Sequence, residues 1–245
     1  KPDMKEILLS VFWSSIPVRK WPVTPDGPKM WQIISSDRHI DRIEHKGKKY
    51  LQEVTDRTMR LFELLIKHKP QKIIYANLGD YWNSDGEHKT THGTPQHNLY
   101  SEKESFRIWL EHQRDMIAQF ATELPVEAIF IGGNHDQNKM QCLWDALALY
   151  FSKSNNVIVD AEPYSRKYRQ WGNTTIWYQH GDAIKLKQVP LTMMSETKLW
   201  KENFMYQGHI HQDRKDHLGN ITVETVASPA WPNERERSNW WTLRD

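Results

Sequence analysis

The stretch Ala128-Ile129-Phe130-Ile131-Gly132-Gly133-Asn134-His135-Asp136 decides how the rest of this sequence is interpreted. Its first four residues form an apolar run that is long enough for a buried strand and too short for a helix. The two glycines then allow a sharp turn, and an amide, an imidazole and a carboxylate follow the strand. In open α/β sheets, ligands bind at this carboxyl end of the strands. Asn, His and Asp are also ordinary turn formers, so the stretch alone leaves a turn and a functional site equally open.

The chain of 245 residues is long enough for one large domain or two small ones. We expect a single domain over residues 31–245, with residues 1–30 as an N-terminal extension or edge strand. The chain begins with Lys1 rather than methionine, so we expect a processed piece. No apolar run has the length of a membrane span and no signal-peptide pattern opens the sequence, which predicts a soluble protein without a membrane partner. Cys142 is the only cysteine, which favours a reducing, cytoplasmic location, and we expect it in the core.

The charge balance is nearly even, with 33 basic and 31 acidic residues and a pI near 8.5. This balance is compatible with an anionic substrate but does not by itself indicate nucleic acid. The 12 histidines are more informative, because a chain with one cysteine must bind any transition metal mainly through nitrogen and oxygen. The 12 tryptophans are expected to serve packing.

Apolar periodicity predicts an alternation of strands and helices. We expect strands at 6–13, 31–35, 72–77, 128–131, 157–159, 166–170, 174–178, 204–206 and 221–226, and helices at 50–68, 101–122, 139–151 and 191–201. Ser101 and Glu104 form a capping box at the start of the second helix, and Gly-Asn pairs at 172–173 and 219–220 indicate hairpins. Between residues 81 and 99 lies a polar loop with three histidines, and a loop of this length is usually functional or disordered.

Four further polar clusters follow predicted strands in the same way as Asn134-His135-Asp136. They are Asp37 with His39, Asp80, His180, and His209 with His211. Each cluster alone has a simpler explanation, as a loop, a helix N-cap or a buried histidine. Five strand ends can nevertheless converge on one edge, and His209 and His211 point to the same face of an extended segment.

Together these side chains predict a metal centre. Mixed carboxylate and imidazole ligands suit Mn, Fe or Zn better than an all-oxygen Mg or Ca site. Seven ligands are too many for one such ion and suit two ions that share a carboxylate. Two ions about 3.5–4 Å apart can stabilise an in-line displacement at phosphorus.

The order of these motifs resembles that of the calcineurin-like metallophosphoesterases. The matching residues lie between Trp31 and Val226 and read Asp37-Arg38-His39, Gly79-Asp80, Gly133-Asn134-His135-Asp136, His180 and Gly208-His209-Ile210-His211. The resemblance implies an α/β fold in which two mixed β-sheets pack as a sandwich flanked by helices, in four layers ordered α/β/β/α. It also implies a phosphoesterase that uses metal-activated hydroxide.

The resemblance further implies a role for each matching residue. One ion would take Asp37, His39, Asp80 and His211, and the other Asp80, Asn134, His180 and His209, with Asp80 bridging. The cofactors would be two divalent ions, in first place Mn²⁺, with Fe, Zn, Ni or Co as alternatives. His135 would contact the phosphate and assist departure of the leaving group, and Asp136 would hold the imidazole of His135.

Two positions depart from the family pattern. Arg38 stands where the family usually has an apolar or small residue, and Asn83 stands where many repair nucleases of the family carry Asp. We expect Arg38 and Asn83 near the phosphate, and Tyr81 and Trp82 as aromatic surfaces for stacking on bases. The run from Asp80 to Asp85 is similar to that of compact, repair-exonuclease-like members carried by phages and prophages, which implies a host cytoplasmic location.

The sequence therefore predicts an enzyme, with a nuclease acting on DNA or RNA as the first hypothesis. Two ions and the carboxylates of Asp37 and Asp80 would leave a pocket charge of roughly +2, which attracts phosphate. Lys89 could add a phosphate contact or be an ordinary surface charge. A phosphomonoesterase acting on a nucleotide or phosphoprotein would use the same site. A non-catalytic scaffold or polymerase-subunit module is less favoured, because such relatives commonly lose ligands that this chain keeps.

Overall fold

The computed structural model describes residues 29–45, 48–197, 199 and 201–230. The strand predicted at 6–13 lies outside the described residues, as does nearly all of the predicted N-terminal extension. The elements are β1 (Met30–Ser35), α2 (Lys48–Ile66), β2 (Lys72–Asn77), α3 (Glu102–Ala121), β3 (Val126–Phe130), α4 (Gln137–Tyr150), β4 (Val157–Asp160), β5 (Arg166–Trp171), β6 (Thr174–Gln179), the 3₁₀ turn η1 (Leu186–Gln188), α5 (Val189–Glu196), β7 (Glu202–Gln207), β8 (Arg214–Leu218) and β9 (Ile221–Thr225).

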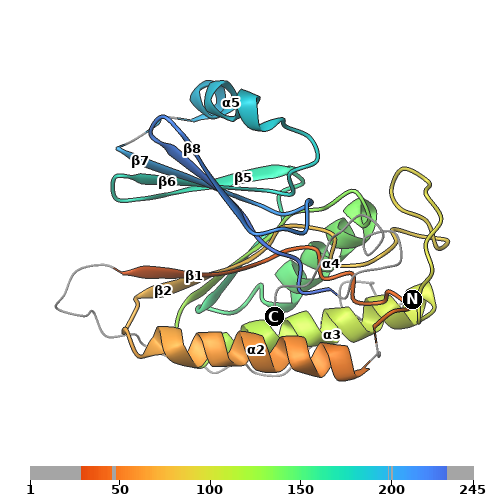
Figure 1. Ribbon diagram of the computed structural model, residues 1–245. Helices are drawn as coiled ribbons and strands as arrows, with labels where there is room; N and C mark the ends of the chain where they lie inside the picture. Colours follow the sequence, from red (N-terminus) through yellow and green to blue (C-terminus); the bar gives the residue numbers. More distant parts are fainter. Residues whose placement is uncertain (1–28, 46–47, 198, 200, 231–245) are drawn as a thin grey trace, which may run out of the picture.

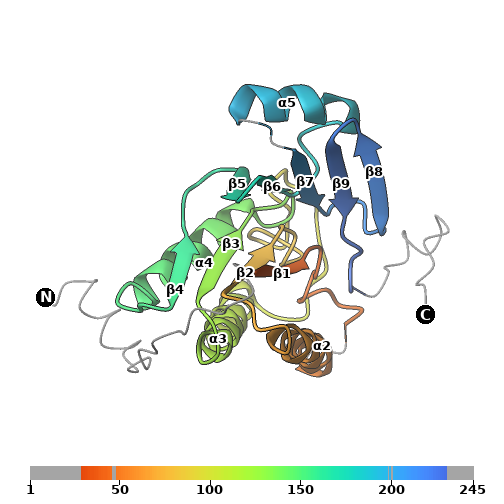
Figure 2. The same cartoon turned by 90° about the vertical axis from the view of Figure 1, so that its left-hand side faces the viewer.

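The strands form two sheets that face each other, with α2 and α3 beneath the first sheet and α5 above the second (Figures 1 and 2). The first sheet has the order β1-β2-β3-β4 and the second has the order β5-β6-β7-β9-β8. The predicted four-layer α/β/β/α arrangement is confirmed. One detail of that prediction is wrong, because only the second sheet is mixed and the described strands of the first are all parallel.

The connections explain why the first sheet is parallel. A helix connects each of its strands to the next, α2 between β1 and β2, α3 between β2 and β3, and α4 between β3 and β4, and such a crossover returns the chain to a parallel position. As a consequence, β1, β2 and β3 all end at the same edge of the sheet. Strands β6, β7 and β9 also run parallel to one another, so β6 and β7 end together as well.

Alternation along the strands fills the three interfaces between the four layers. On β2, Ile73 and Tyr75 face the helices, whereas Ile74 and Ala76 face the second sheet. On β6, Trp177 packs with Val189 and Met193 in a cluster between the second sheet and α5. Its neighbours in the strand, Ile176 and Tyr178, pack between the two sheets. The strands read as continuous apolar runs because both of their faces are buried.

Local signals in the sequence were accurate at most element ends. The capping box is formed, with the Ser101 hydroxyl accepting from the Glu104 N–H and the Glu104 carboxylate accepting from the Ser101 N–H. The last predicted helix is shorter than expected, because α5 ends at Glu196. Cys142 was expected in the core and is exposed, since the buried face of α4 is formed by residues such as Leu143 and Leu147.

A partly buried ionic network joins the two sheets on the side of β4 and β5. The carboxylate of Glu127 pairs with both Lys72 and Arg169, and Arg169 also pairs with Asp160. The ammonium group of Lys167 lies 2.9 Å from Oδ1 of Asp160. Burial opposes ionisation of Asp160, but the hydrogen bonds from Arg169 and Lys167 outweigh it and lower the pKa of this carboxyl. The network therefore holds the sandwich together away from the strand ends that carry the polar clusters.

None of the helices in the described part of the chain has the length and hydrophobicity of a membrane span.

Candidate metal centre

The seven predicted ligands all follow the ends of strands, and the structure brings them together. Asp37 and His39 come after β1, Asp80 after β2, Asn134 after β3, His180 after β6, and His209 and His211 after β7. Their side chains form overlapping groups of the kind that hold metal ions. The parallel course of β1–β3 and of β6–β7 is what delivers them to one place.

The first group contains Asp37, His39 and His211. The Nε2 atom of His211 lies 3.3 Å from Oδ1 of Asp37 and 3.2 Å from Nε2 of His39. Two ring nitrogens and a carboxylate oxygen thus point at one another within contact distance. This group matches the ligand set predicted for one ion.

The second group contains Asp80, His180 and His209, with the amide of Asn134 between the two imidazoles. The Oδ1 atom of Asn134 lies 3.0 Å from Nε2 of His180 and 3.0 Å from Nδ1 of His209. The Nε2 atom of His180 is also 3.3 Å from Oδ2 of Asp80. This group matches the set predicted for the other ion.

Asp80 lies between the two groups. Its Oδ2 atom is 3.3 Å from His180 on one side and 4.0 Å from Nε2 of His39 on the other. The backbone carbonyl of Leu78 meets Nδ1 of His180 at 2.8 Å and orients that ring, as expected of an outer partner of a ligating histidine. The geometry therefore agrees with Asp80 as the shared ligand.

The chemistry of these side chains fits divalent cations. The Oδ1 atom of Asp37 is buried without a hydrogen-bond partner, which is costly unless another group satisfies it. Burial, reinforced by Arg42, lowers the pKa of His39 well below its usual range, so this imidazole is neutral and able to ligate. Burial also disfavours a charged His180, but the adjacent carboxylate of Asp80 raises the pKa of His180 overall. A positive charge is therefore favoured where His180 and Asp80 meet.

The backbone around these groups is strained. Five of the seven predicted ligands have positive φ values, namely Asp37 (51°), His39 (41°), Asp80 (50°), His209 (71°) and His211 (59°). Such conformations are uncommon for residues other than glycine and concentrate at functional sites. Gly133 and Gly208 allow the close approach, because an added Cβ would lie 2.1 Å from Oδ1 of Asp80 or 2.2 Å from Oδ2 of Asp37, respectively.

The role predicted for Asp136 is wrong. Its carboxylate is fully buried and accepts four backbone N–H groups, those of Asp80, Tyr81, Trp82 and Gly133, at 2.6–3.2 Å. Burial and the neighbouring carboxylate of Asp80 raise the pKa of Asp136. Because these bonds use both oxygens, Asp136 joins the turn after β2 to the turn after β3 and does not hold the imidazole of His135.

A different group holds His135. The Nδ1 atom of this half-buried imidazole lies 2.8 Å from the backbone oxygen of Asn83. A carbonyl oxygen can only accept, so Nδ1 carries the proton and Nε2 is free of this contact. His135 also forms a possible metal-holding group with His39 and Asp80, and its ring centroid is 4.7 Å from that of His39. The imidazole thus lies beside the predicted ligands, and its contact with the substrate stays a prediction.

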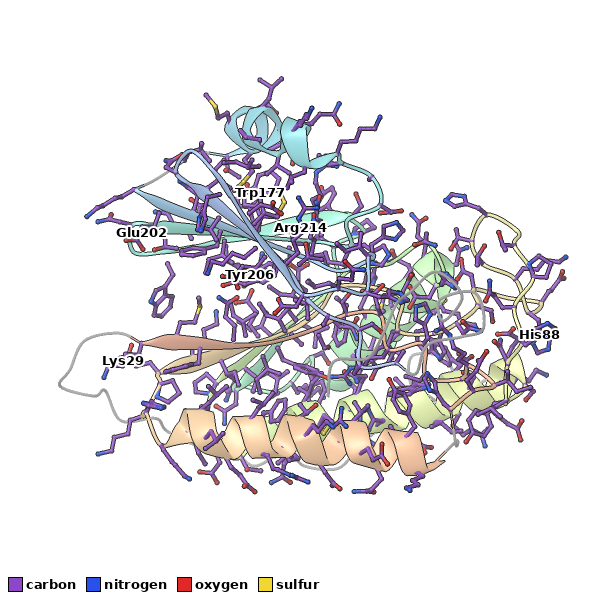
Figure 3. The ribbon with its side chains drawn as sticks, viewed as in Figure 1. Lys29, His88, Trp177, Glu202, Tyr206 and Arg214 are labelled. Atoms are coloured by element: carbon purple, nitrogen blue, oxygen red, sulfur yellow. The ribbon has the colours of Figure 1, made fainter. Side chains whose placement is uncertain are left out.

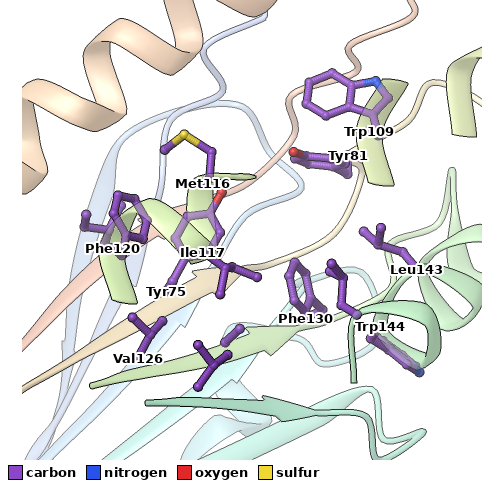
Figure 4. Close-up of a cluster of buried hydrophobic side chains, with 14 of the residues drawn as sticks. Tyr75, Tyr81, Trp109, Met116, Ile117, Phe120, Val126, Phe130, Leu143 and Trp144 are labelled. Atoms are coloured by element: carbon purple, nitrogen blue, oxygen red, sulfur yellow. The ribbon is translucent and has the colours of Figure 1, made fainter. Parts of the chain in front are cut away.

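The predicted aromatic contacts to substrate are wrong. Tyr81 and Trp82 have no exposed surface. Tyr81 packs edge-on against Trp109, and Trp82 stacks on Phe106 of the same helix, α3. Figure 4 shows Tyr81 and Trp109 in the core beside α3. Both aromatic side chains point away from the turn that carries Asp80, so they cannot stack on bases.

The predicted polar contacts to phosphate also lie elsewhere. Arg38 is buried, with its guanidinium carbon 5.5 Å from the centre of the Tyr81 ring. The amide of Asn83 contacts the loop itself, with Nδ2 at 3.0 Å from Oδ1 of Asn98. Lys89 lies 3.6 Å from Glu87 on the same exposed loop. The positions after strands predicted which side chains lie together, but proximity in sequence did not predict the surroundings of Arg38, Asn83 and Lys89.

Two carboxylates that support the loop between β2 and α3 were not anticipated. Asp41, which follows β1, accepts the Asn83 N–H at 2.7 Å, and Asp85, within the loop, accepts N–H groups at the start of α4. The length of the loop was the available signal, since such loops are usually functional. Its exposed His88 projects at the far end of the loop (Figure 3) and belongs to none of the metal-holding groups found among the described residues.

Comparison with known proteins gives similarity of structure only. No family model and no curated protein match the chain. Solved structures that it resembles include YfcE, a phosphoesterase from E. coli (TM-score 0.41, 15% identity, 80% of this chain and 79% of that one). Another is a novel archaeal phosphodiesterase (TM-score 0.39, 13% identity, 80% of this chain and 83% of that one). A third is Vps29 of Entamoeba histolytica complexed with zinc (TM-score 0.39, 11% identity, 82% of this chain and 76% of that one). Because these identities and TM-scores are low, the chemistry of the site is inferred from its own geometry.

Proposed function

We propose that this chain is a calcineurin-like metallophosphoesterase that hydrolyses phosphodiester bonds with two divalent metal ions, with nucleic acid as the substrate class. The observation that carries the proposal is the pair of ligand groups that meet at Asp80, one with His39 and His211 and the other with His180 and His209. When bound there, divalent ions would stabilise charge on phosphoryl oxygens and acidify a water molecule.

The residues of the chain contribute binding and proton transfer. The carboxylates of Asp37 and Asp80 set the charge of the pocket, which two divalent ions would bring to roughly +2. The Nε2 atom of His135 is left for the substrate side, because Nδ1 donates to the Asn83 carbonyl. From this position an imidazole can donate a proton to a leaving oxygen, a contribution on the order of 10²–10⁴ in rate.

The two cationic side chains expected at the phosphate do not distinguish a diester from a monoester. The two cationic side chains considered for phosphate contact, Arg38 and Lys89, are respectively buried against Tyr81 and exposed beside Glu87. A phosphate diester carries one negative charge, and a monoester carries nearly two at neutral pH. A pocket of roughly +2 attracts either substrate, so the substrate panel contains both classes.

The test is a substrate panel with protein loaded with Mn²⁺ and shown to bind metal. The panel contains single- and double-stranded DNA, RNA, nucleoside monophosphates and a phosphopeptide, with Asp80→Ala as the inactive control. We expect nucleic-acid hydrolysis in the wild type and none in the variant. Faster hydrolysis of the monoesters would instead identify a phosphomonoesterase. Protein that holds two ions and cleaves no substrate would refute the proposal.

A further inference from the structure

Helix α4 begins directly after the turn that carries Asn134 and His135, and it lacks a cap of its own. Asp136 occupies the N-cap position, but its side chain makes no capping hydrogen bond. The first N–H groups of a helix need acceptors from elsewhere. Here the loop between β2 and α3 supplies them.

Asp85 is the main acceptor. Its Oδ1 atom accepts the Lys139 N–H at 2.8 Å, and its Oδ2 atom accepts the Asn138 N–H at 3.1 Å and the Asn138 side-chain amide at 2.7 Å. The Thr91 hydroxyl donates to the same Oδ2 at 2.8 Å and accepts the Gln137 N–H at 3.2 Å. A carboxylate is also favoured at a helix N-terminus by the helix dipole. Asp85 therefore fastens the loop to α4.

This attachment lies close to His135 on both sides of the imidazole. Two residues before Asp85, the Asn83 carbonyl accepts from Nδ1 of His135 at 2.8 Å. Two residues after His135, α4 begins with Gln137, whose N–H donates to Thr91. The groups that fix His135 at its ring and at its backbone are thus connected to each other through Asp85.

We propose that Asp85 is a positioning residue for His135, which fixes the distance between the Asn83 carbonyl and the turn that carries the imidazole. Asp85 itself contacts neither ligand group. Its effect on catalysis rests on the proposed function, whereas its effect on the imidazole does not. Loss of the Asp85 carboxylate should release the loop and let the Nδ1 proton exchange between tautomers.

Kinetics in two backgrounds test the effect on catalysis. Asp85→Ala should lower kcat for a phosphodiester about 10- to 100-fold, the range found for outer partners of metal-site residues. KM and the content of metal should stay unchanged. In a His135→Asn background the same substitution should change kcat less than 2-fold, because the group on which Asp85 acts is already gone. An equal loss in both backgrounds, or loss of metal together with rate, would overturn the proposal.

Two further variants separate positioning from general damage to the loop. Glu87→Ala removes a carboxylate whose side chain is 87% exposed on the same loop, and its kcat should equal that of the wild type. Asp85→Asn keeps one acceptor oxygen and should recover part of the rate lost in Asp85→Ala. A rate in Asp85→Asn no better than in Asp85→Ala, with both variants folded, would count against the proposal.

The imidazole itself provides a measurement independent of activity. Protein labelled with ¹⁵N-histidine and loaded with diamagnetic Zn²⁺ gives ring-nitrogen signals, and the His135 signals are assigned by their loss in His135→Asn. The wild type should show a protonated Nδ1, and Asp85→Ala should show a mixture of tautomers. If the wild type hydrolyses no substrate, the proposed function fails, and this measurement still decides whether Asp85 positions His135. An unchanged Nδ1 signal in Asp85→Ala would refute positioning.

Discussion

Removal of the Asp136 carboxylate should unfold the turns that carry the ligands. Its Oδ1 atom accepts from the N–H groups of Asp80 and Gly133 at 3.2 and 2.9 Å. Its Oδ2 atom accepts from those of Tyr81 and Trp82 at 2.6 and 3.0 Å. In Asp136→Ala all four donors lose their acceptor in a region closed to solvent. At the lower limit of about 1 kcal/mol for each unsatisfied buried donor, the free energy of unfolding should fall by about 4 kcal/mol.

The assay is urea unfolding of metal-free protein, followed by circular dichroism, with the metal content measured separately by atomic emission. Asp136→Asn keeps one acceptor oxygen, so it should lose about half as much, roughly 2 kcal/mol. Asp136→Ala should also bind less metal, because the backbone of Asp80 loses its support. Asp145→Ala, an exposed carboxylate further along α4, is the matched control and should stay within about 0.5 kcal/mol of the wild type.

One result would refute this reasoning. If Asp136→Ala kept its stability and metal but lost rate to the same extent as His135→Asn, the carboxylate would act on the imidazole after all. The sequence-based role of Asp136 would then be right and the backbone contacts would be incidental.

Three further outcomes are expected. Asp80→Ala should lose both metal and activity, because Asp80 lies between the two ligand groups. Asn83→Ala should keep its metal. Equal loss of metal in both variants, measured by elemental analysis, would show that the predicted ligand set is wrong. His135→Asn should keep its metal and its melting temperature and should hydrolyse diesters on the order of 10²–10⁴-fold more slowly. The loss of rate should be smaller for leaving groups that are stable anions. A loss of rate that does not depend on the leaving group would exclude the role of His135 as an acid. Arg169→Leu should cost about 1–2 kcal/mol in urea unfolding, since it removes one of the two cationic partners of Glu127 and of Asp160 and leaves Lys72 and Lys167 in place. Because the pKa of Asp160 is lowered in the folded state, its ionised carboxylate stabilises the fold above about pH 4, and this contribution is lost as the pH falls through the folded-state pKa. The free energy of unfolding of Arg169→Leu should therefore fall less steeply at acid pH than that of the wild type.

The fold was largely predictable because its signals are local. Apolar runs with turn residues at their ends predicted the strands, and the capping box at Ser101 and Glu104 predicted the start of α3. The parallel order of the first sheet follows from the helices that connect its successive strands. The mixed character expected for that sheet came from the family resemblance, and it was wrong because each connecting helix returns the chain to a parallel position.

The convergence of the predicted ligands was foreseeable for a related reason. Asp37, Asp80 and Asn134 each follow a strand of one parallel sheet, and parallel strands bring their carboxyl ends together whatever the rest of the chain does. The residue types then indicate the chemistry, because carboxylates and imidazoles placed together suit divalent transition metals. Sequence position was therefore sufficient to predict that these side chains meet, and their role as metal ligands stays a prediction.

Tertiary structure alone decided what the neighbouring residues do. Tyr81 and Trp82 follow Asp80 directly, yet they are buried because α3 supplies Trp109 and Phe106 to cover them. Asp136 follows His135, yet it serves backbone groups from the turn after β2. The direction of a side chain in a turn depends on which distant element packs against it and which unpaired N–H groups lie within reach. That information is absent from the local sequence, because the partners lie tens of residues away and meet only in the folded chain.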